Sequence, residues 1–163
     1  MRRVKIITDS ASDLPSRFFK EYDIAMLPMG IVIGDKTYLD RVELDSKTFF
    51  NMMREDTTSL PKTVMPSAES IKEEFLRNLD KYENQIFISI SSRGSGTFGV
   101  AAMVKNEIED ELGHPSNITI LDSLSFSAGY GIVVYEMAKL AFEGADYAKV
   151  MDKYNNTINN VRV

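Results

Sequence analysis

The sequence predicts an α/β fold: a mostly parallel sheet with helices on both faces, together with a small hairpin. Short β-rich runs alternate with segments whose apolar residues recur every three or four positions. The connections between these runs are long enough to be crossover helices, which join parallel strands. The 163 residues suffice for a single domain with its own core.

The chain opens with a predicted strand and helix. Residues 4–8 are a β-rich run that ends in Thr8-Asp9-Ser10. In the helix that follows, Ser12 or Asp13 is the expected N-cap. Pro15 is expected in the first turn, where its missing N–H has little effect.

A second extended run and a hairpin are predicted next. Residues 25–33 form the run, and Gly34-Asp35-Lys36 turns residues 37–39 back on it. Asp45 is then expected to cap a short helix. Residues 56–65 show little periodicity, which predicts a loop.

Two amphipathic helices are predicted in the middle of the chain. Ser67 can cap the first of them. Its apolar residues stand at spacings of four, four and three: Ile71, Phe75, Leu79 and Tyr82. In the second helix an apolar residue recurs every fourth position from Val100 to Leu112, and Gly113 ends it.

Two more strands and two more helices complete the prediction. Residues 85–90 and residues 117–121 are β-rich runs on either side of the second amphipathic helix. Ser127 is the expected cap of a helix that reaches about Glu143, and Asp146 is the expected cap of a last helix.

Composition excludes several classes of function. The sequence has no Cys and a single His, His114, which excludes thiolate metal sites, cysteine nucleophiles and sites with two or three histidines. The formal net charge of −5 and the lack of a basic cluster argue against a nucleic-acid partner. The amino terminus lacks the apolar run of a signal peptide, and we expect a cytoplasmic protein.

Three predicted strands end in hydroxyl and carboxyl side chains: Thr8-Asp9-Ser10, Ser91-Ser92 and Asp122-Ser123. The carboxyl ends of parallel strands share one edge of the sheet, and open α/β sheets bind their ligands there. This edge is therefore the candidate site, with Ser10, Ser92 and Ser123 among its candidate ligand-binding residues.

The loop from Ser91 to Thr97 is the most specific part of this candidate site. Gly94 and Gly96 let backbone N–H groups turn toward a ligand, and the next helix offers its amino end to an anion. A carboxylate or a phosphate would suit such a loop. The alternative is that these residues only form a turn and a helix cap.

Ser95 does not fit a serine-hydrolase site. A nucleophile elbow needs Gly two residues before and two residues after the Ser, where this sequence has Arg93 and Thr97. The only candidate base, His114, follows a helix of about 15 residues and should therefore lie about 20 Å away. We interpret His114 as an exposed loop residue.

A metal site and a kinase site are weaker interpretations. Asp9 and Asp122 could together hold Mg²⁺, but an Asp after a strand commonly caps the next turn. No Walker loop is present, because Gly94 and Gly96 are not followed by Gly-Lys-Ser or Gly-Lys-Thr.

Methionines are concentrated near the polar loops of the first half, at positions 26, 29, 52, 53 and 65. Their flexible thioethers suit a cavity that accepts apolar ligands, although most such residues belong to cores. Beside an anion-binding edge, an apolar cavity would match a fatty acid.

Four segments, read together, carry a resemblance to a known family. They are Thr8 to Pro15, Pro61 to Ser67, Ile90 to Phe98, and Asp122-Ser123 with Gly129 and Gly131. In order, spacing and composition they resemble the DegV family along nearly the whole chain. The resemblance implies a bacterial protein that binds a long-chain fatty acid and presents it to a separate fatty acid kinase subunit. That kinase makes the acyl phosphate used in phospholipid synthesis, so this chain would be no enzyme and would need no cofactor besides the bound acid.

The resemblance also implies which residues hold the ligand. The hydroxyls of Thr63 and Ser95 would hold the carboxylate, and Gly96 and Thr97 would supply backbone amides. Where the family usually has Ser-Gln, this sequence has Val64-Met65, which removes a hydroxyl and an amide from the loop. Gly94 likewise replaces a usual Leu, and we expect fewer contacts to the head group.

Length is a further departure from the family. Family members resemble a two-domain protein nearly twice as long, so residues 1–163 would be the first domain, with the second domain absent. An isolated half should bind poorly or expose an apolar face, which would favour a homodimer through the surface that the second domain would cover.

The residues themselves leave three hypotheses. The first is the fatty-acid-binding protein. The second is a Mg²⁺-dependent enzyme that binds a phosphate or nucleotide through Asp9, Asp122 and the Ser95 loop. The third is an interaction domain in which these loops only cap helices.

Overall fold

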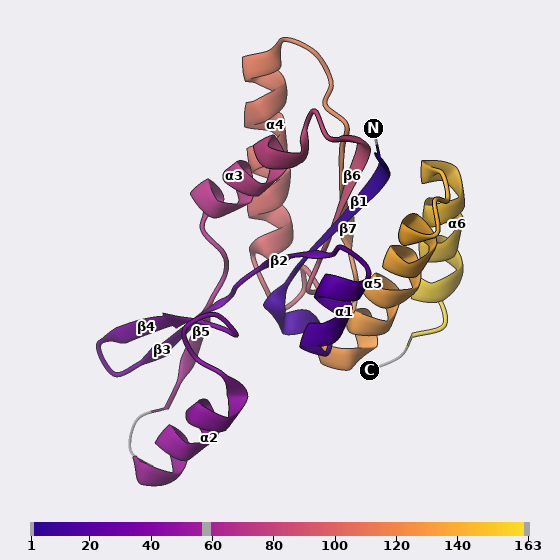
Figure 1. Ribbon diagram of the computed structural model, residues 1–163. Helices are drawn as coiled ribbons and strands as arrows, with labels where there is room; N and C mark the ends of the chain where they lie inside the picture. Colours follow the sequence, from indigo (N-terminus) through magenta and orange to yellow (C-terminus); the bar gives the residue numbers. More distant parts are fainter. Residues whose placement is uncertain (1, 57–59, 162–163) are drawn as a thin grey trace.

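The structure, a computed structural model, describes residues 2–56 and 60–161 and contains two sheets (Figure 1). The larger sheet is parallel, and its strands lie in the order β2 (Ala25–Leu27), β1 (Arg2–Asp9), β6 (Tyr82–Ser89) and β7 (Ile118–Asp122). β1 and β6 pair from Arg2, opposite Tyr82, to Thr8, opposite Ile88. The predicted parallel α/β sheet is confirmed.

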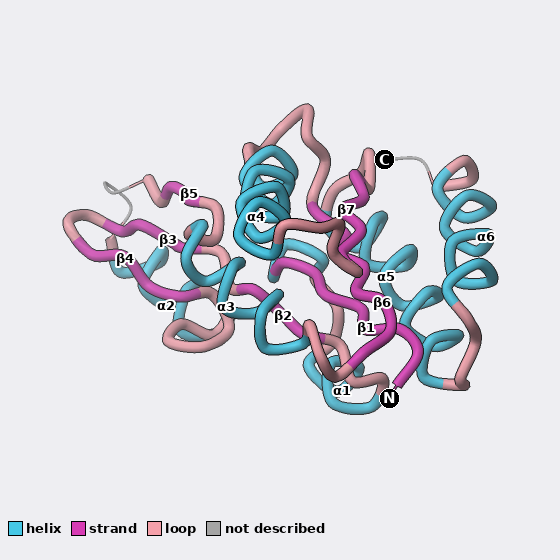
Figure 2. Tube along the Cα trace, turned by 90° about the horizontal axis from the view of Figure 1, so that it is seen from above, coloured by secondary structure: helices cyan, strands magenta, loops and turns pink. Residues whose placement is uncertain are grey.

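Helices cover both faces of this sheet, as predicted (Figure 2). On one face lie α1 (Ser16–Glu21), α5 (Ser127–Phe142) and α6 (Tyr147–Ile158). On the other face lie α3 (Ala68–Asn78) and α4 (Thr97–Leu112). Each crossover between parallel strands therefore leaves a helix against the sheet.

The two faces of the sheet hold separate cores. Ile6 of β1 packs with the residues of α5 and α6, whereas its neighbour Ile7 packs with those of α3 and α4. Both side chains are buried, because successive residues of a strand point to opposite faces and both faces are covered. The central strands consequently read as continuous apolar runs in the sequence.

The smaller sheet is antiparallel and projects from the main body together with α2 (Figure 1). Its strands are β4 (Lys36–Leu39), β3 (Gly30–Ile33) and β5 (Lys62–Val64), and α2 spans Ser46–Glu55. The predicted hairpin is the pair β3 and β4. The smaller sheet and α2 therefore form a separate layer that lies near the carboxyl end of β1 (Figure 1).

The second extended run and the following loop differ from the prediction. Residues 25–33 are divided between the two sheets, because Pro28 has no N–H to continue a ladder. Residues 62–64, expected in a loop, form β5 by pairing with β3. This pairing is tertiary, so no local periodicity marks it; residues 57–59 of the expected loop lie outside the described residues.

The start of α1 was predicted wrongly. Pro15, not Ser12 or Asp13, occupies its N-cap position, and no side chain caps this helix. A separate short helix, η1 (Ser10–Ser12), precedes it and is capped by Asp9. The sequence pattern could not separate these two short elements.

Two further expectations are corrected at helix ends. Tyr82 begins β6 instead of continuing the stripe of α3, because α3 ends at Asn78. Ser127 is the first residue of α5 and not its cap, a position held by Phe126. The Ser127 hydroxyl instead donates to Asp13 Oδ2 across 2.6 Å.

Several other expected features are confirmed. Asp45, Ser67 and Asp146 each accept a hydrogen bond from a backbone N–H in the first turn of their helices. Gly113 ends α4 with a φ of 71°, a left-handed conformation that glycine adopts without strain. His114 is an exposed loop residue.

We predict opposite effects for two glycine substitutions within helices. A Cβ at Gly131 of α5 would lie 2.3 Å from the backbone oxygen of Ser12, whereas a Cβ at Gly99 of α4 would meet nothing within 4 Å. Gly131→Ala should therefore lower the free energy of unfolding by about 1–3 kcal/mol. Gly99→Ala should raise it by up to about 1 kcal/mol. Urea denaturation measures both, and equal effects would contradict the packing described here.

Candidate ligand-binding site

The polar ends of the three strands meet at the carboxyl edge of the parallel sheet. Asp9, at the end of β1, accepts a hydrogen bond from the backbone N–H of Ile90 across 3.0 Å. Asp122, at the end of β7, accepts one from the backbone N–H of Ser92 across 3.1 Å. Each carboxylate therefore ties the end of its own strand to the segment after β6.

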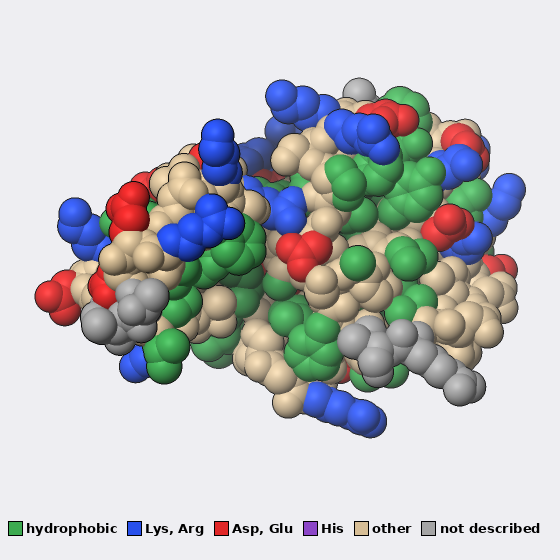
Figure 3. All heavy atoms as spheres, turned by 90° about the horizontal axis from the view of Figure 1, so that it is seen from below, with side chains coloured by type: hydrophobic (Ala, Val, Ile, Leu, Met, Phe, Trp, Pro, Cys, Tyr) green, Lys and Arg blue, Asp and Glu red, His purple; other side chains and the backbone are tan. Residues whose placement is uncertain are grey.

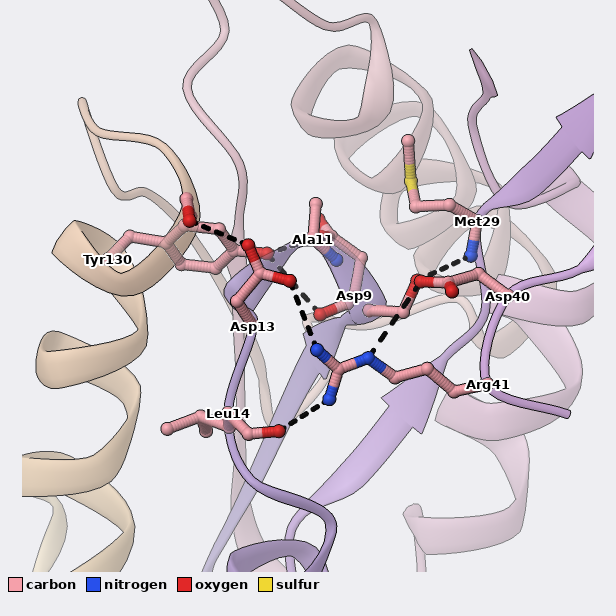
Figure 4. A network of polar contacts seen from close by, with 10 residues as sticks. Asp9, Ala11, Asp13, Leu14, Met29, Asp40, Arg41 and Tyr130 are labelled. Carbon is pink, nitrogen blue, oxygen red and sulfur yellow. Dashed lines mark hydrogen bonds and ion pairs between the residues drawn. The ribbon is translucent and has the colours of Figure 1, made fainter. Parts of the chain in front are cut away.

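Asp9 is fully buried and has two further donors (Figure 4). The Tyr130 hydroxyl of α5 and the backbone N–H of Ala11 both donate to Oδ1. Burial raises the pKa of Asp9 above its ordinary value, although these hydrogen bonds act to lower it. Burial and the charge of Asp9 also raise the pKa of Tyr130, so the phenol stays protonated and remains a donor.

A second network joins the smaller sheet to the main body (Figure 4). The Asp13 carboxylate accepts hydrogen bonds from Arg41 Nη2, across 3.1 Å, and from Ser127 Oγ. Arg41 Nη1 donates to the backbone oxygen of Leu14. Asp13, Arg41 and Ser127 all have a positive φ, a disfavoured backbone conformation. Asp13 thus accepts hydrogen bonds from two residues that share its unusual conformation.

The carboxylates at this edge already have hydrogen-bond partners. Among residues 2–56 and 60–161, no group of three or more His, Asp or Glu side chains is arranged to hold a metal ion. Asp9 also accepts a hydrogen bond from the Ala11 N–H and Asp122 accepts one from the Leu124 N–H, so each carboxylate caps the turn after its strand, the structural role weighed for them in the sequence.

A cavity of about 620 Å³ lies beside this edge, between the segment after β5 and the start of α4. Thr63, Ser95 and Gly96 line it together, so the structure brings three of the predicted ligand-binding residues to one place. Its remaining walls are largely apolar: Met29, Val64, Met65, Pro66, Ala68, Ile90, Val100 and Met103, with Ser67 and Gly94.

The polar end of this cavity is the beginning of α4. Ser95 Oγ and Thr97 Oγ1 lie 2.9 Å apart, and the backbone N–H of Thr97 donates to Ser95 Oγ across 3.3 Å. Gly96 is the N-cap residue of this 16-residue helix and makes no side-chain cap. Ser95 is half-buried and Thr63 is exposed, and both hydroxyls lie in the cavity beside a helix amino end, an arrangement whose chemistry suits an anion.

The glycines of the loop allow close approach of two apolar side chains. A Cβ at Gly96 would lie 3.1 Å from Met65 Sδ, and a Cβ at Gly94 would lie 2.6 Å from the Phe126 ring. A Leu at position 94 therefore could not coexist with Phe126 in this position. The departure from the family pattern at Gly94 thus has a local packing reason.

The other four predicted site residues do not line the cavity. Ser10 is buried, and its hydroxyl accepts a hydrogen bond from the backbone N–H of Met29 across 3.0 Å. Ser123 is also buried and donates to the backbone oxygen of Ser125 across 3.1 Å. Ser92 is exposed. Thr97 is buried beneath Ser95.

A second, smaller cavity was missed by the sequence reasoning. It measures about 290 Å³ and lies where α2 and the smaller sheet meet the main body. Apolar side chains make most of its wall: Ala11, Met29, Ile31, Leu44, Phe49, Phe50 and Ile90. Of the five methionines noted in the sequence, only Met29 lines this wall, while Met29 and Met65 line the first cavity. The adjacent aromatic pair Phe49-Phe50 was the available signal.

The fold and this site define an α/β protein with a cavity at the carboxyl edge of its sheet. One end of this cavity is polar, its other walls are apolar, and a smaller apolar cavity lies beside it. The chain belongs to the DegV family, because the family model described as "Uncharacterised protein, DegV family" matches residues 3–163. The resemblance seen in the motifs is thereby confirmed.

The comparisons also show relatives that are longer than this chain. A DegV domain-containing protein of Caldanaerobacter subterraneus is 30% identical over 99% of this chain and 55% of its own length. One from Clostridium perfringens is 34% identical over 97% of this chain and 56% of its own length. The chain therefore spans about half the length of the curated relatives it matches.

Solved structures show the same fold. A DegV family protein from Thermus thermophilus, described by its fatty acid binding, superposes with a TM-score of 0.83 at 25% identity, over 96% of this chain and 54% of that one. The Fatty Acid Kinase (Fak) B3 protein of Streptococcus pneumoniae, described as loaded with linoleic acid, superposes with a TM-score of 0.76 at 21% identity. This second likeness covers 96% of this chain and 54% of that one, and it shows the fold alone.

Within the described part of the chain, none of the helices has the length and hydropathy needed to cross a bilayer. The cytoplasmic location expected from the sequence stays a prediction.

We predict a pH-dependent loss of stability in Tyr130→Phe. The substitution leaves the buried Asp9 without one donor and should lower the free energy of unfolding by about 1–3 kcal/mol near neutral pH. Losing this bond raises the pKa of Asp9 further. Folded Asp9 in the variant therefore binds its proton at a higher pH than in the wild type. The deficit should shrink as the pH falls below neutral, because the folded variant takes up the Asp9 proton before the folded wild type does.

Tyr154→Phe is the matched control for this experiment. The Tyr154 hydroxyl donates to the backbone oxygen of Asp122 across 2.7 Å, and this acceptor does not titrate. Its deficit in urea denaturation should stay constant over the same pH range. An equally constant deficit in Tyr130→Phe would show that the Asp9 charge does not depend on Tyr130.

Proposed function

We propose that this protein binds a long-chain fatty acid and presents it to a separate fatty acid kinase subunit. The observation that carries the proposal is the cavity of about 620 Å³ in which the hydroxyls of Thr63 and Ser95 lie beside apolar walls. One end of the cavity suits an anion and the rest suits a hydrocarbon, which is the chemistry of a fatty acid.

The carboxylate binds at Thr63, Ser95 and the start of α4. The two hydroxyls donate hydrogen bonds to its oxygens, the Gly96 amide adds the positive end of the helix dipole, and the Thr97 amide, also predicted to contact the ligand, donates to Ser95 Oγ and so orients that hydroxyl. Each hydrogen bond to a charged group contributes about 1.5–3 kcal/mol. These contacts orient the acid, with its head group at the edge of the sheet.

The acyl tail supplies most of the binding free energy. Burial of one methylene contributes about 0.8 kcal/mol, so a tail of about 15 methylenes contributes on the order of 12 kcal/mol before ordering costs are subtracted. Val64 and Met65 stand where the family usually has Ser-Gln, and they line the apolar wall of the cavity. The departure thus exchanges contacts to the head group for contacts to the tail.

Two relatives with the same fold support the choice of ligand and partner. The Thermus protein is described by its fatty acid binding, and the pneumococcal protein is described as a fatty acid kinase B3 protein loaded with linoleic acid. In this proposal the chain binds the acid and the partner transfers the phosphoryl group. The kinase partner is the finer part of the proposal and follows the family resemblance of the motifs.

We also propose that residues 1–163 correspond to the first domain of a two-domain DegV-like protein. The half-length matches to the relatives support this assignment. Apolar side chains at the mouth of the cavity are partly open to solvent, among them Val64, Met65 and Met103. A homodimer would cover such a surface in the isolated chain.

We predict that Ser95→Ala and Thr63→Val each weaken binding of hexadecanoate by about 10- to 100-fold, because each removes one hydrogen bond to the carboxylate. Titration calorimetry with delipidated protein measures this loss. Native mass spectrometry of protein purified from cells detects an acid that is already bound.

Thr37→Val is the control for the Thr63 substitution. Thr37 is exposed on β4 of the same small sheet but lines neither cavity. The affinity of the Thr37→Val variant for hexadecanoate should therefore equal that of the wild type. Unchanged affinity in both Ser95→Ala and Thr63→Val, with the fold intact, would disprove the proposed head-group site.

A further inference from the structure

The two cavities at the carboxyl edge adjoin each other. Met29, Thr63 and Ile90 line both of them, so these three residues are the boundary between the larger and the smaller cavity. Seen from below, hydrophobic side chains gather in the hollow between the part that carries α2 and the main body (Figure 3). A hydrocarbon chain that starts at Thr63 therefore has the apolar side chains of Met29 and Ile90 beside it at the boundary of the two cavities.

The charges around the smaller cavity fix the direction of an occupant. Asp40 is the acidic residue in its wall. Arg41 Nε lies 3.9 Å from Asp40 Oδ2, and the Arg41 guanidinium also forms an ion pair with Asp13. A carboxylate placed there would be repelled by the carboxylate of Asp40. The hydroxyl of Ser95 and the start of α4 lie in the other cavity, so the head group stays on that side.

Strand β3 and helix α2 supply further walls of the smaller cavity, with Ile31 beside Thr63 and Phe50 on α2. Ile31 pairs directly with Thr63 in the register of β3 and β5, so both side chains stand on the same face of the small sheet. Phe50 packs against Phe49, with the ring centroids 5.4 Å apart. Phe50 is nevertheless 59% exposed, which means that this ring separates the cavity from solvent.

We infer that the acyl tail passes between Met29 and Ile90 into the smaller cavity, that Ile31 bounds the first part of this path beside Thr63, and that Phe50 sets the longest chain the protein accommodates. This inference rests on the proposed fatty acid binding and adds the residues that select chain length. Thr63 lies at the junction and thereby holds the head group at a fixed distance from the end of the cavity.

The test is a series of saturated acids from octanoate to octadecanoate, with affinity measured by titration calorimetry. In the wild type, affinity should rise by about fourfold for each added methylene until the smaller cavity is full, and then level off. Ile31→Trp fills the cavity, so the rise should end at a shorter acid. Phe50→Ala opens its end, so the rise should continue to a longer acid.

Two substitutions on α5 serve as matched controls. Ile132→Trp and Phe142→Ala change exposed residues that line neither cavity, and Phe142 is 61% exposed, close to the value for Phe50. Both should keep the wild-type dependence on chain length. If Ile31→Trp does not fold, as judged by circular dichroism, the exposed position of Phe50 makes Phe50→Ala the deciding variant.

Different failures separate this inference from the proposed function. If the wild type binds no acid of any length, both are overturned. If affinity depends on chain length but Ile31→Trp and Phe50→Ala keep the wild-type profile, the tail does not enter the smaller cavity. A shortened profile in Met103→Trp would then place the tail along α4, because Met103 lines only the larger cavity.

Discussion

The buried carboxylate of Asp9 is the interaction on which the carboxyl edge of the sheet depends. It stands at the end of β1 and takes hydrogen bonds from the segment after β6, from η1 and from Tyr130 of α5. A buried charge is stable only when such donors surround it. The Asp9 side chain thus fixes three segments relative to one another, and Ile90, one of its partners, is also a wall of both cavities.

The cavities exist because the chain leaves the parallel sheet and builds a second one beside it. Pro28 ends the ladder after β2, and the chain then turns into β3. Arg41 holds the turn after β4 against the loop after η1 through Asp13 and the backbone of Leu14. The space enclosed between the two layers is therefore set by polar contacts at its rim, while its walls remain apolar.

The sequence predicted the layers of the fold, because they depend on local signals. The strands of the parallel sheet, most of the helices and the caps Asp45, Ser67 and Asp146 lie where they were expected, whereas Tyr82 and the run of residues 25–33 do not. The family motifs pointed to Thr63 and Ser95, which share one cavity, although their contact with a ligand stays a prediction. Strand β5 and the smaller cavity were missed, because pairing with β3 and the approach of Phe50 to the main body are tertiary events without a local pattern.

A crystal structure of the protein with bound hexadecanoate tests the central claim most directly. The account predicts the carboxylate within hydrogen-bonding distance, about 3 Å, of both Thr63 Oγ1 and Ser95 Oγ. A carboxylate more than about 3.5 Å from both hydroxyl oxygens would contradict the account, even if the acid were bound at another place on the protein.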